Sequence, residues 1–421
     1  MTCLTPMTQE KTLVSLKKIL YISYDGLTDP LGQSQILPYL KGLSALGYQF
    51  TILSFEKKER YKREKIYLEQ LTSEAGIRWI PLSFTKTPPL LSKMYDNIRM
   101  RMMAFRLQRK NKFDMVHCRS YIAADTGLAL KKKYGLKFFF DMRGFWADEK
   151  KDSGAWNVAN PIFKKVYKYY KEKEAAYLQN ADYIISLTHA AKNELMSWKS
   201  YNRKVPVEVI PTCADINHFS LTDPEQKKQS REMFGISQNS FVLSYLGSVG
   251  TWYMLEEMLL FFRQLKKYYP EAIFLFITPT PRSVIEEEIK KAGLLQKDFI
   301  IKEVSRKEVP FVMKASDVNI SFIKPVYSKI SSSPTKLGEV LSMGIPVICN
   351  SGVGDVEQIV NSTSSGYVLD NFSEKDFERA IQSIPVLLQK SPLAIRNAVK
   401  DIFSLEKGIQ SYFSCYRQVL P

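Results

Sequence analysis

Short apolar runs alternate with longer stretches of helical spacing along the first half of the chain. Between Ser34 and Leu46 the apolar residues recur at the spacing of a helix, and this stretch stops at Gly47. The apolar runs are Lys18–Tyr24, Phe50–Phe55, Met115–Cys118, Phe138–Phe140 and Tyr183–Ser186. Runs that are apolar throughout, separated by helical stretches, predict a parallel sheet covered by helices on both faces.

The pattern breaks between Ser200 and Pro211 and then starts again. The runs of the second half are Phe241–Leu246, Ala272–Ile277, Phe299–Ile301, Val318–Phe322 and Pro346–Cys349. We therefore expect two doubly wound α/β domains, at residues 1–204 and 205–390, followed by C-terminal helices at residues 391–421. Ligands of such sheets bind beyond the carboxyl ends of the strands, so two facing domains predict a site in the cleft between them.

The composition is that of a globular protein, since 45% of the 421 residues are hydrophobic and 24% are charged. Residues 1–10 contain no apolar core of signal-peptide length, so we expect no secretion signal. No window reaches the roughly 18 apolar residues of a membrane span. The five cysteines lie far apart without C-x-x-C spacing, which indicates free thiols in a reducing compartment. Three histidines do not support a histidine-rich metal site.

The net charge of +17 is distributed unevenly along the chain. Residues 1–204 carry 36 Lys and Arg against 19 Asp and Glu, whereas residues 205–421 carry 24 of each. A basic half beside a neutral half indicates that one of the two domains faces an anionic partner.

A turn with two glycines follows the first apolar run of the second half. Gly247, Ser248, Gly250 and Thr251 lie between this run and a helical stretch that begins at Met254. Glycine lets the backbone approach a ligand closely, and the amides of a helix N-terminus favour an anion such as a phosphate. Taken alone, the segment also fits a tight turn without a ligand, because the G-x-G-x-x-G spacing is absent.

A second segment, Ser331–Ile348, combines a helix start with a cation and a carboxylate. Pro334 suits the first turn of a helix, with a serine as its cap. Lys336 and Glu339 then lie one turn apart on the same face. A cation that reaches a phosphate, beside a carboxylate that accepts from a sugar diol, fits a nucleotide; an exposed ion pair is the alternative.

Together with segments elsewhere in the chain, and in the same order, these two resemble the family-4 retaining glycosyltransferases. The segments that carry the resemblance are Gly26–Gln35, Asp141–Glu149, Ala181–Thr188, Val209–Asp215 with Phe219, Gly247–Tyr253, Ser333–Glu339, Met343–Val347 and Gly352–Asp355. The resemblance covers most of residues 16–420. It implies the GT-B fold, in which two Rossmann-like domains face each other across a cleft, with the acceptor on the first and the nucleotide-sugar on the second.

The family's last helix commonly crosses back to the first domain. Residues 408–419 fit that helix, because Ile409, Tyr412, Phe413 and Tyr416 fall on one face.

By position, the resemblance also implies a donor site. Glu339 corresponds to the glutamate that holds the nucleotide ribose, and Gly247 with Gly250 to the turn beside the phosphates. Gly32 with Gln33 corresponds to the first-domain loop that faces the donor phosphates. The other residues expected around the donor are Ser248, Thr251, Lys324, Ser331, Pro334, Thr335 and Lys336.

Three positions depart from the family pattern. Ser331 stands where the family often has a glutamate on the donor hexose, and Ser248 and Tyr253 stand where it often has an arginine and a lysine on the phosphate turn. A diphosphate still needs cationic partners, so we expect Lys336 to supply the first. The further candidates are Lys324, Lys329 and Arg143.

The implied reaction is a front-face substitution with retention, in which the enzyme stabilises the departing phosphate and positions the acceptor. The expected catalytic residues are Arg143, Lys336 and Glu339, with no metal and no cofactor besides the nucleotide-sugar donor. On the acceptor side we expect Asp148, Glu149 and His189, each of which also fits a solvent-facing position.

Four basic clusters account for the excess charge, at residues 57–65, 99–112, 131–137 and 164–173. The last three are interspersed with Met, Phe or Tyr, which is typical of a surface that lies on an anionic bilayer. The alternative is that these are solvated outer faces whose apolar residues pack inward. A lipid-linked acceptor would give the membrane surface a purpose.

We therefore expect a cytoplasmic glycosyltransferase, peripheral on the inner face of the cell membrane, that acts on a glycan or lipid-linked acceptor in polysaccharide or glycan assembly. A GT-B sugar-nucleotide epimerase is a weaker alternative, because its acid and base residues are not found. A nucleic-acid-binding protein is also weaker, because no such module is present and the neutral half has no role in it. We expect no nucleic-acid partner.

Overall fold

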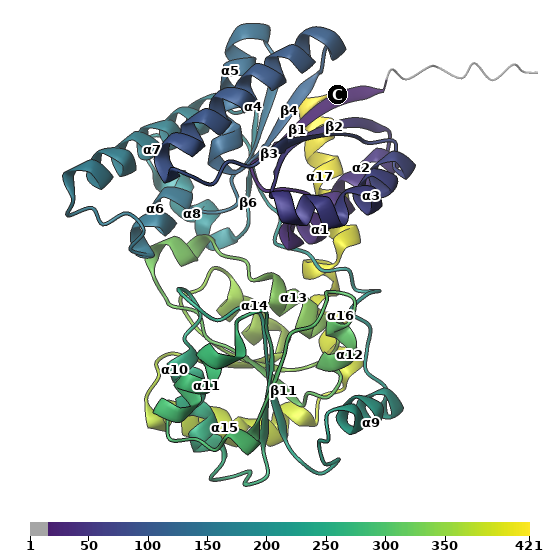
Figure 1. Ribbon diagram of the computed structural model, residues 1–421, viewed down its shortest axis with the longest axis vertical. Helices are drawn as coiled ribbons and strands as arrows, with labels where there is room; N and C mark the ends of the chain where they lie inside the picture. The colour runs from purple at the N-terminus through teal and green to yellow at the C-terminus, as the bar shows by residue number, and fades with distance from the viewer. Residues whose placement is uncertain (1–15) are drawn as a thin grey trace, which may run out of the picture.

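The computed structural model describes residues 16–421, apart from the side chains of residues 89 and 90, and has two lobes that each enclose a sheet (Figure 1). The strands of the first lobe are β1 (Lys17–Ser23), β2 (Tyr48–Glu56), β3 (Arg78–Ser83), β4 (Met115–Arg119), β5 (Lys137–Asp141), β6 (Tyr183–Ser186) and β7 (Val207–Val209). They form one sheet in the order β3-β2-β1-β4-β5-β6-β7, and every pair is parallel.

The second lobe repeats this arrangement. Its strands are β8 (Val242–Leu246), β9 (Ile273–Ile277), β10 (Phe299–Lys302), β11 (Val318–Ser321), β12 (Val347–Asn350) and β13 (Gly366–Leu369). Their order is β10-β9-β8-β11-β12-β13, again with every pair parallel. Two doubly wound α/β domains are thus confirmed, and in both sheets the strand order reverses beside the first strand.

Helices cover both faces of each sheet (Figure 1). Those of the first lobe are α1 (Pro30–Gln35), α2 (Leu37–Ala45), α3 (Lys58–Glu74), α4 (Pro89–Asn111), α5 (Ser120–Tyr134), α6 (Trp146–Asp152), α7 (Pro161–Asn180) and α8 (His189–Ser197). The following ones are α9 (Pro224–Met233), α10 (Leu255–Leu265), α11 (Arg282–Lys291), η1 (Gln296–Asp298), α12 (Val309–Met313), η2 (Tyr327–Ser331), α13 (Thr335–Ser342), α14 (Val356–Thr363), α15 (Glu374–Leu388), α16 (Pro392–Phe403) and α17 (Leu405–Val419).

The central strands are buried on both faces, which explains why they read as continuous apolar runs. In β1, Leu20 and Ile22 belong to the cluster that includes α4 and α5, whereas Ile19 and Tyr21 belong to the cluster that includes α2 and α17. All four side chains are at most 3% exposed. A strand in this position alternates between two cores rather than between core and solvent.

Edge strands are where the sequence pattern and the structure differ. Neither β3 nor β13 is among the expected runs, because most of their residues are only half-buried. Strand β7 pairs with β6 in the first sheet, so this sheet extends past the boundary expected at residues 204 and 205. The expected helix Ser34–Leu46 is divided, since the backbone breaks at Ile36 between α1 and α2.

The two C-terminal helices join the lobes. Helix α16 packs on α13 of the second lobe, and α17 crosses back to lie against α2 of the first (Figure 1). The tyrosines expected on the inner face of this last helix are buried: Tyr416 shares a hydrogen bond of 2.6 Å with His117 Nδ1, and the Tyr412 hydroxyl donates to Asp141 Oδ2 at 3.1 Å. Both partners lie at the carboxyl half of central strands.

The described cysteines, at positions 118, 213, 349 and 415, are free and buried. Within residues 16–421, no helix combines the length and hydropathy needed to cross a bilayer. The segment 1–10, for which no secretion signal is expected, and Cys3 lie outside the described residues.

Tyr416→Ala should destabilise the first lobe by about 3–5 kcal/mol, because it opens a cavity and leaves the imidazole of His117 without its partner. The tyrosine ring is fully buried against Tyr48 and Phe139. Chemical denaturation followed by fluorescence measures the change. The control is Leu295→Ala, at a site that is 61% exposed; equal stability losses in the two variants would contradict the packing role of α17.

Candidate active site

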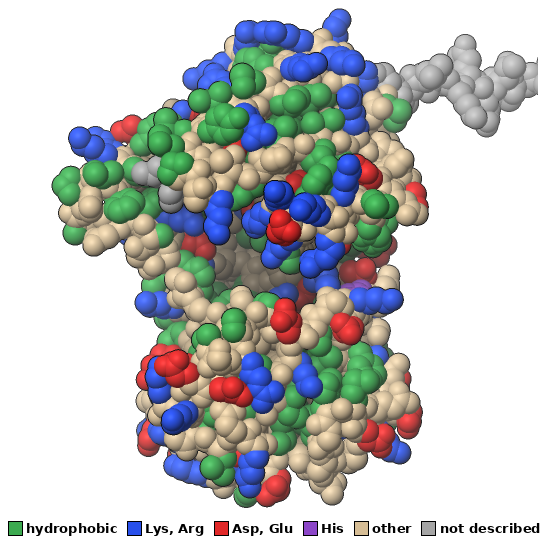
Figure 2. All heavy atoms as spheres, viewed as in Figure 1, with side chains coloured by type: hydrophobic (Ala, Val, Ile, Leu, Met, Phe, Trp, Pro, Cys, Tyr) green, Lys and Arg blue, Asp and Glu red, His purple; other side chains and the backbone are tan. Residues whose placement is uncertain are grey.

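The carboxyl ends of the two sheets face each other across a hollow between the lobes, and Lys and Arg side chains gather on the rim of the first lobe (Figure 2). From the first lobe, the segments after β1 and β5 reach this edge. From the second, the segments after β8 and β11 reach it. In the second sheet these segments flank the point where the strand order reverses, and in the first sheet the segment after β1 borders the corresponding point; ligands of doubly wound sheets bind at such points.

The turn after β8 requires glycine at two positions. Gly247 and Gly250 have φ of 133° and 149°, which a side chain would strain. The turn is fixed by its neighbours, because the Tyr245 hydroxyl donates to the Ser248 carbonyl at 2.8 Å and the Val249 amide donates to Thr280 Oγ1 at 3.0 Å. A side chain at Gly250 would meet open space, so its glycine serves backbone conformation rather than packing.

Helix α13 begins beside this turn. Pro334 occupies the N-cap position and no side chain caps the helix, so the expected serine cap is not formed. In the first turn, the Leu337 amide donates to the Pro334 carbonyl at 3.0 Å. The amides of Thr335 and Lys336 remain for an anion at the cleft. A Cβ at Gly247 would lie 4.0 Å from Cγ of Lys336, so Lys336 runs along the turn. Thr335 is half-buried at the same helix end.

Glu339 is fully buried and binds two cations. Lys336 Nζ donates to its Oε2 at 3.2 Å, and Arg306 Nη1 donates to its Oε1 at 2.8 Å. Both cations are about one-third exposed, so they link the buried carboxylate to the cleft surface. A buried carboxylate needs such partners, because an unpaired charge is strongly unfavourable there.

Sequence reasoning did not identify Arg306. It lies in the segment after β10, and its guanidinium stands 5.4 Å from the centroid of the Phe219 ring. Its backbone carbonyl also shares a hydrogen bond of 3.1 Å with His218 Nε2. The available signal was a cation four residues after the end of β10, in the segment that reaches the cleft in such sheets.

Two other residues expected around the donor, Lys324 and Ser331, differ in burial and in the contacts that they make. The Lys324 side chain is exposed, and its backbone amide donates to the Trp252 carbonyl at 2.9 Å. Ser331 is buried: its hydroxyl donates to the Ser328 carbonyl at 2.7 Å and accepts from the Phe145 amide of the first lobe at 2.9 Å. Ser331 therefore contributes to the contact between the lobes in this structure.

Gly32 and Gln33, expected on a loop, lie on helix α1, and the loop that precedes this helix is held by Glu56. This buried carboxylate accepts from the amides of Leu27 and Thr28 at 2.9 and 3.0 Å, and also from the Thr28 hydroxyl. A Cβ at Gly32 would collide with the loop backbone at positions 26 and 27. Gly32 is thus required by packing, and Gln33 is half-buried beside it. Glu56 was not expected from the sequence.

Arg143 lies at the end of β5 in a left-handed backbone conformation, with φ of 56°. Such a conformation is uncommon outside glycine and persists only where its surroundings hold it. Nη1 lies 3.9 Å from Asp141 Oδ1. Burial opposes the charged forms, yet Asp141 raises the pKa of Arg143 above its usual value, and Arg143 with His117 holds the pKa of Asp141 below its own. Arg143 is therefore a fixed, permanent cation.

The three residues expected on the acceptor side lie in different surroundings. Asp148 is buried and accepts from the Tyr167 hydroxyl at 2.6 Å and from Lys171 Nζ at 2.9 Å, so its carboxylate is fully occupied within the first lobe. Glu149 is 40% exposed and accepts from Lys329 of the second lobe at 2.9 Å. Only Glu149 of these two acids combines exposure with a contact across the lobes.

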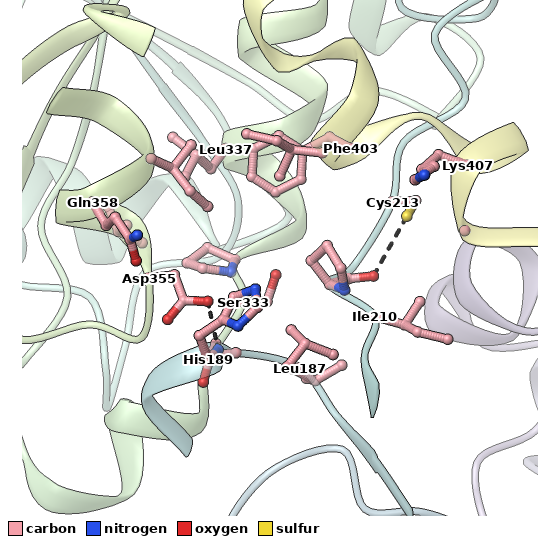
Figure 3. Close-up of a pocket in the computed structure, with 18 of the residues that line it drawn as sticks. Leu187, His189, Ile210, Cys213, Ser333, Leu337, Asp355, Gln358, Phe403 and Lys407 are labelled. Atoms are coloured by element: carbon pink, nitrogen blue, oxygen red, sulfur yellow. Dashed lines mark hydrogen bonds between the residues drawn. The ribbon is translucent and has the colours of Figure 1, made fainter. Parts of the chain in front are cut away.

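His189 begins helix α8, and its amide donates to Asp355 Oδ2 at 2.6 Å across the lobes (Figure 3). It lines a cavity of about 360 Å³ between the lobes and the crossing segment, together with Leu337 and Phe403. The residues that line this cavity include neither Lys336 nor Glu339. The structure thus places His189 at a separate cavity from the Glu339 cluster.

Two family models match the chain. "Glycosyltransferase Family 4" matches residues 35–218, and "Glycosyl transferases group 1" matches residues 226–397. Among curated proteins, a guanylate kinase from Carboxydothermus hydrogenoformans is 43% identical over 42 residues, but the match covers 10% of this chain and 21% of that kinase.

Solved structures share the fold over almost the whole chain. Sucrose-phosphate synthase from Thermosynechococcus elongatus has a TM-score of 0.71 at 15% identity, and covers 96% of this chain and 99% of its own. A glycosyltransferase from Rickettsia africae has a TM-score of 0.69 at 17% identity, with coverage of 96% and 99%. HepE from Anabaena, solved in complex with UDP and glucose, has a TM-score of 0.68 at 14% identity, with coverage of 95% and 99%.

Glu56→Ala should release the loop at residues 26–35, because two backbone amides and the Thr28 hydroxyl lose a buried acceptor. We expect amide hydrogen exchange at Leu27 and Thr28 to accelerate at least tenfold while exchange in β8 stays unchanged. Glu59→Ala, on the neighbouring helix α3, is the control. Unchanged protection of the loop in Glu56→Ala would show that other contacts hold it.

Proposed function

Because the chain belongs to the family-4 glycosyltransferases and has their GT-B fold, we propose that it transfers a sugar from a nucleoside-diphosphate sugar to a hydroxyl of a glycan or lipid-linked acceptor. The donor occupies the second lobe and the acceptor the first. The resemblance found in the sequence and the shared fold support this division, and so does the concentration of positive charge in the first lobe.

The observation that carries the proposal is the cluster of Glu339 with Lys336 and Arg306 beside the Gly247 turn. A buried carboxylate at this point accepts hydrogen bonds from the two ribose hydroxyls. Lys336 and the first two amides of α13 then face the diphosphate, and Arg306 lies on the nucleoside side near Phe219. UDP is the first nucleotide to test, because HepE was solved with UDP.

We propose a retaining transfer in which the protein's cations, rather than a metal, stabilise the departing diphosphate. As the bond between sugar and phosphate lengthens, negative charge grows on the phosphate oxygens, where Lys336 and the helix amides are already in place. The acceptor hydroxyl attacks from the same face and transfers its proton toward the leaving phosphate. Arg143, fixed by Asp141, supplies positive charge from the first lobe.

The first lobe also presents a surface suited to an anionic membrane. One face of α4 is apolar and faces solvent; its members, each 55% to 64% exposed, are Leu91, Met94, Tyr95, Ile98 and Met102. On the opposite face Met100 and Ala104 are fully buried, so inward packing does not account for the outer residues. Figure 2 shows hydrophobic and basic side chains intermixed over this lobe.

Basic residues surround this apolar face of α4. Those on the same helix are Arg99, Arg101, Arg106, Arg109 and Lys110. Each Lys or Arg near an anionic bilayer contributes roughly 1 kcal/mol, while the apolar face enters the headgroup region. We propose that this surface holds the acceptor lobe on the cytoplasmic leaflet, where a lipid-linked acceptor of glycan assembly would be presented.

Glu339→Ala should lower transfer at least a hundredfold while the fold is retained, because the ribose loses its acceptor and Lys336 its anchor. Release of nucleoside diphosphate from UDP-, GDP- and dTDP-sugars measures the reaction, and circular dichroism checks the fold. The control is Glu287→Ala, at an exposed ion pair of α11. Turnover near that of the unaltered protein would rule out this donor site.

Replacing Met94 and Ile98 together by glutamate should reduce binding to vesicles of phosphatidylglycerol and phosphatidylcholine at least tenfold. The substitutions place two negative charges where the apolar face would enter the bilayer. Flotation measures the bound fraction, with Ile66 and Tyr67 of α3 replaced by glutamate as the matched control. Equal losses in the two double variants, or equal binding of the unaltered protein to vesicles without phosphatidylglycerol, would contradict the membrane surface on α4.

A further inference from the structure

Lys329 is a buried lysine between the two lobes that the proposed reaction has not used. It lies in η2 directly before α13 and is 6% exposed. Its ammonium donates to Glu149 Oε1 of the first lobe at 2.9 Å and lies 3.7 Å from the centroid of the Trp252 ring. A buried ammonium is unfavourable without partners, so this position is maintained by the carboxylate and the aromatic face together.

The backbone around Lys329 is fixed by contacts across the lobes. The Ser328 amide donates to Asp152 Oδ2 at 2.9 Å, and the ring of Tyr327 stacks on that of Phe145 with centroids 5.6 Å apart. On the other side of Lys329, the Ile330 carbonyl accepts from the Thr188 hydroxyl at 2.7 Å. The ammonium can therefore change partners by moving its own side chain, without a shift of η2.

The glycine turn itself carries no positive charge. Its residues, Gly247–Tyr253, include no Lys, Arg or His. Lys336 runs along the turn at Gly247, and the Lys329 ammonium lies on Trp252 near the other end. The two lysines therefore stand at different ends of the turn, and a diphosphate bound along it needs cationic partners for both of its phosphates.

The ammonium also has unused donors. It has three N–H groups, and among the described residues Glu149 is its one hydrogen-bond acceptor. Glu149 is 40% exposed, whereas the Lys329 side chain is 8% exposed. The carboxylate is thus accessible to solvent, while the lysine lies deeper, beside the turn.

From these contacts we infer that Lys329 is a second cation for the donor diphosphate, and that Glu149 is its partner while the donor is absent. The inference rests on the proposed function. When the diphosphate binds, the ammonium turns from one carboxylate to phosphate oxygens that carry more charge. Glu149 is then free to accept a hydrogen bond from the acceptor hydroxyl. Donor binding thereby prepares the acceptor side of the cleft.

A purely structural ion pair between the lobes makes a different prediction. If Lys329 and Glu149 only held the lobes together, removing either side chain would loosen the contact between the lobes. The affinity for the donor would then fall in both variants. If Glu149 competes with the diphosphate for Lys329, the two substitutions act in opposite directions. The sign of the Glu149 effect therefore separates the two explanations.

The test is calorimetry on the full chain with whichever of UDP, GDP and dTDP binds most tightly. We expect Lys329→Met to weaken binding at least tenfold and Glu149→Gln to tighten it about two- to fivefold. The double variant should match Lys329→Met, because the competitor matters only when the lysine is present. Affinity for the corresponding nucleoside, which has no phosphates, should stay the same in all four proteins.

Two further variants test whether the loss of affinity comes from the positive charge at position 329. Lys291→Met removes an exposed lysine of α11 and should leave affinity unchanged, and Lys329→Arg, which keeps the cation, should recover part of the loss. Wild-type affinity in a folded Lys329→Met protein, or weaker binding in Glu149→Gln, would overturn the inference alone. Failure of the unaltered protein to bind any of the three diphosphates would overturn the proposed function as well.

Discussion

A buried carboxylate at the end of a central strand sets the geometry on which the cleft depends. Asp141 accepts from the Tyr412 hydroxyl of the crossing helix α17 and faces the guanidinium of Arg143. The same ion therefore attaches the last helix to the first lobe and stands beside a cation whose side chain is 10% exposed. Because α16 and α17 are consecutive and pack on different lobes, this attachment also restricts how far the second lobe can turn away from the first. Removing a partner from such a buried charge is strongly unfavourable, so the arrangement is maintained as a unit.

The net charge of each half of the chain does not predict the charge close to the cleft. The second half is neutral overall, yet it supplies Lys336, Arg306 and Lys329 to one small region. A bound anion responds to the cations within a few ångströms rather than to net charge, since solvent screens distant charges over about 10 Å. The excess of the first half acts over longer distances, which suits a membrane surface better than a single diphosphate.

The sequence predicted what depends on local pattern. Continuous apolar runs identified the central strands because both faces of each are buried, and the spacing of Lys336 and Glu339 placed them together because one helical turn separates them. Arg306 and Glu56 were missed, since their roles arise from segments brought together only by the fold. Asp148 has the residue type and position expected for an acceptor contact, but Tyr167 and Lys171 of α7 occupy it. No local signal distinguishes an occupied carboxylate from an available one.

Four of the cations described around the cleft share one property, which is that each has a carboxylate partner. Lys336 and Arg306 bind Glu339, Lys329 binds Glu149, and Arg143 faces Asp141. A donor diphosphate therefore exchanges partners instead of filling a site of unpaired charge, and its binding free energy is the difference between the two sets of contacts. The carboxylates keep the cations of such a site ordered, but they lower its affinity for the diphosphate, because these ion pairs must be broken on binding. In the proposed reaction each released carboxylate gains a new partner, because Glu339 turns to the ribose and Glu149 to the acceptor. The groups that form these ion pairs are then the same ones that recognise the substrates in the proposed reaction.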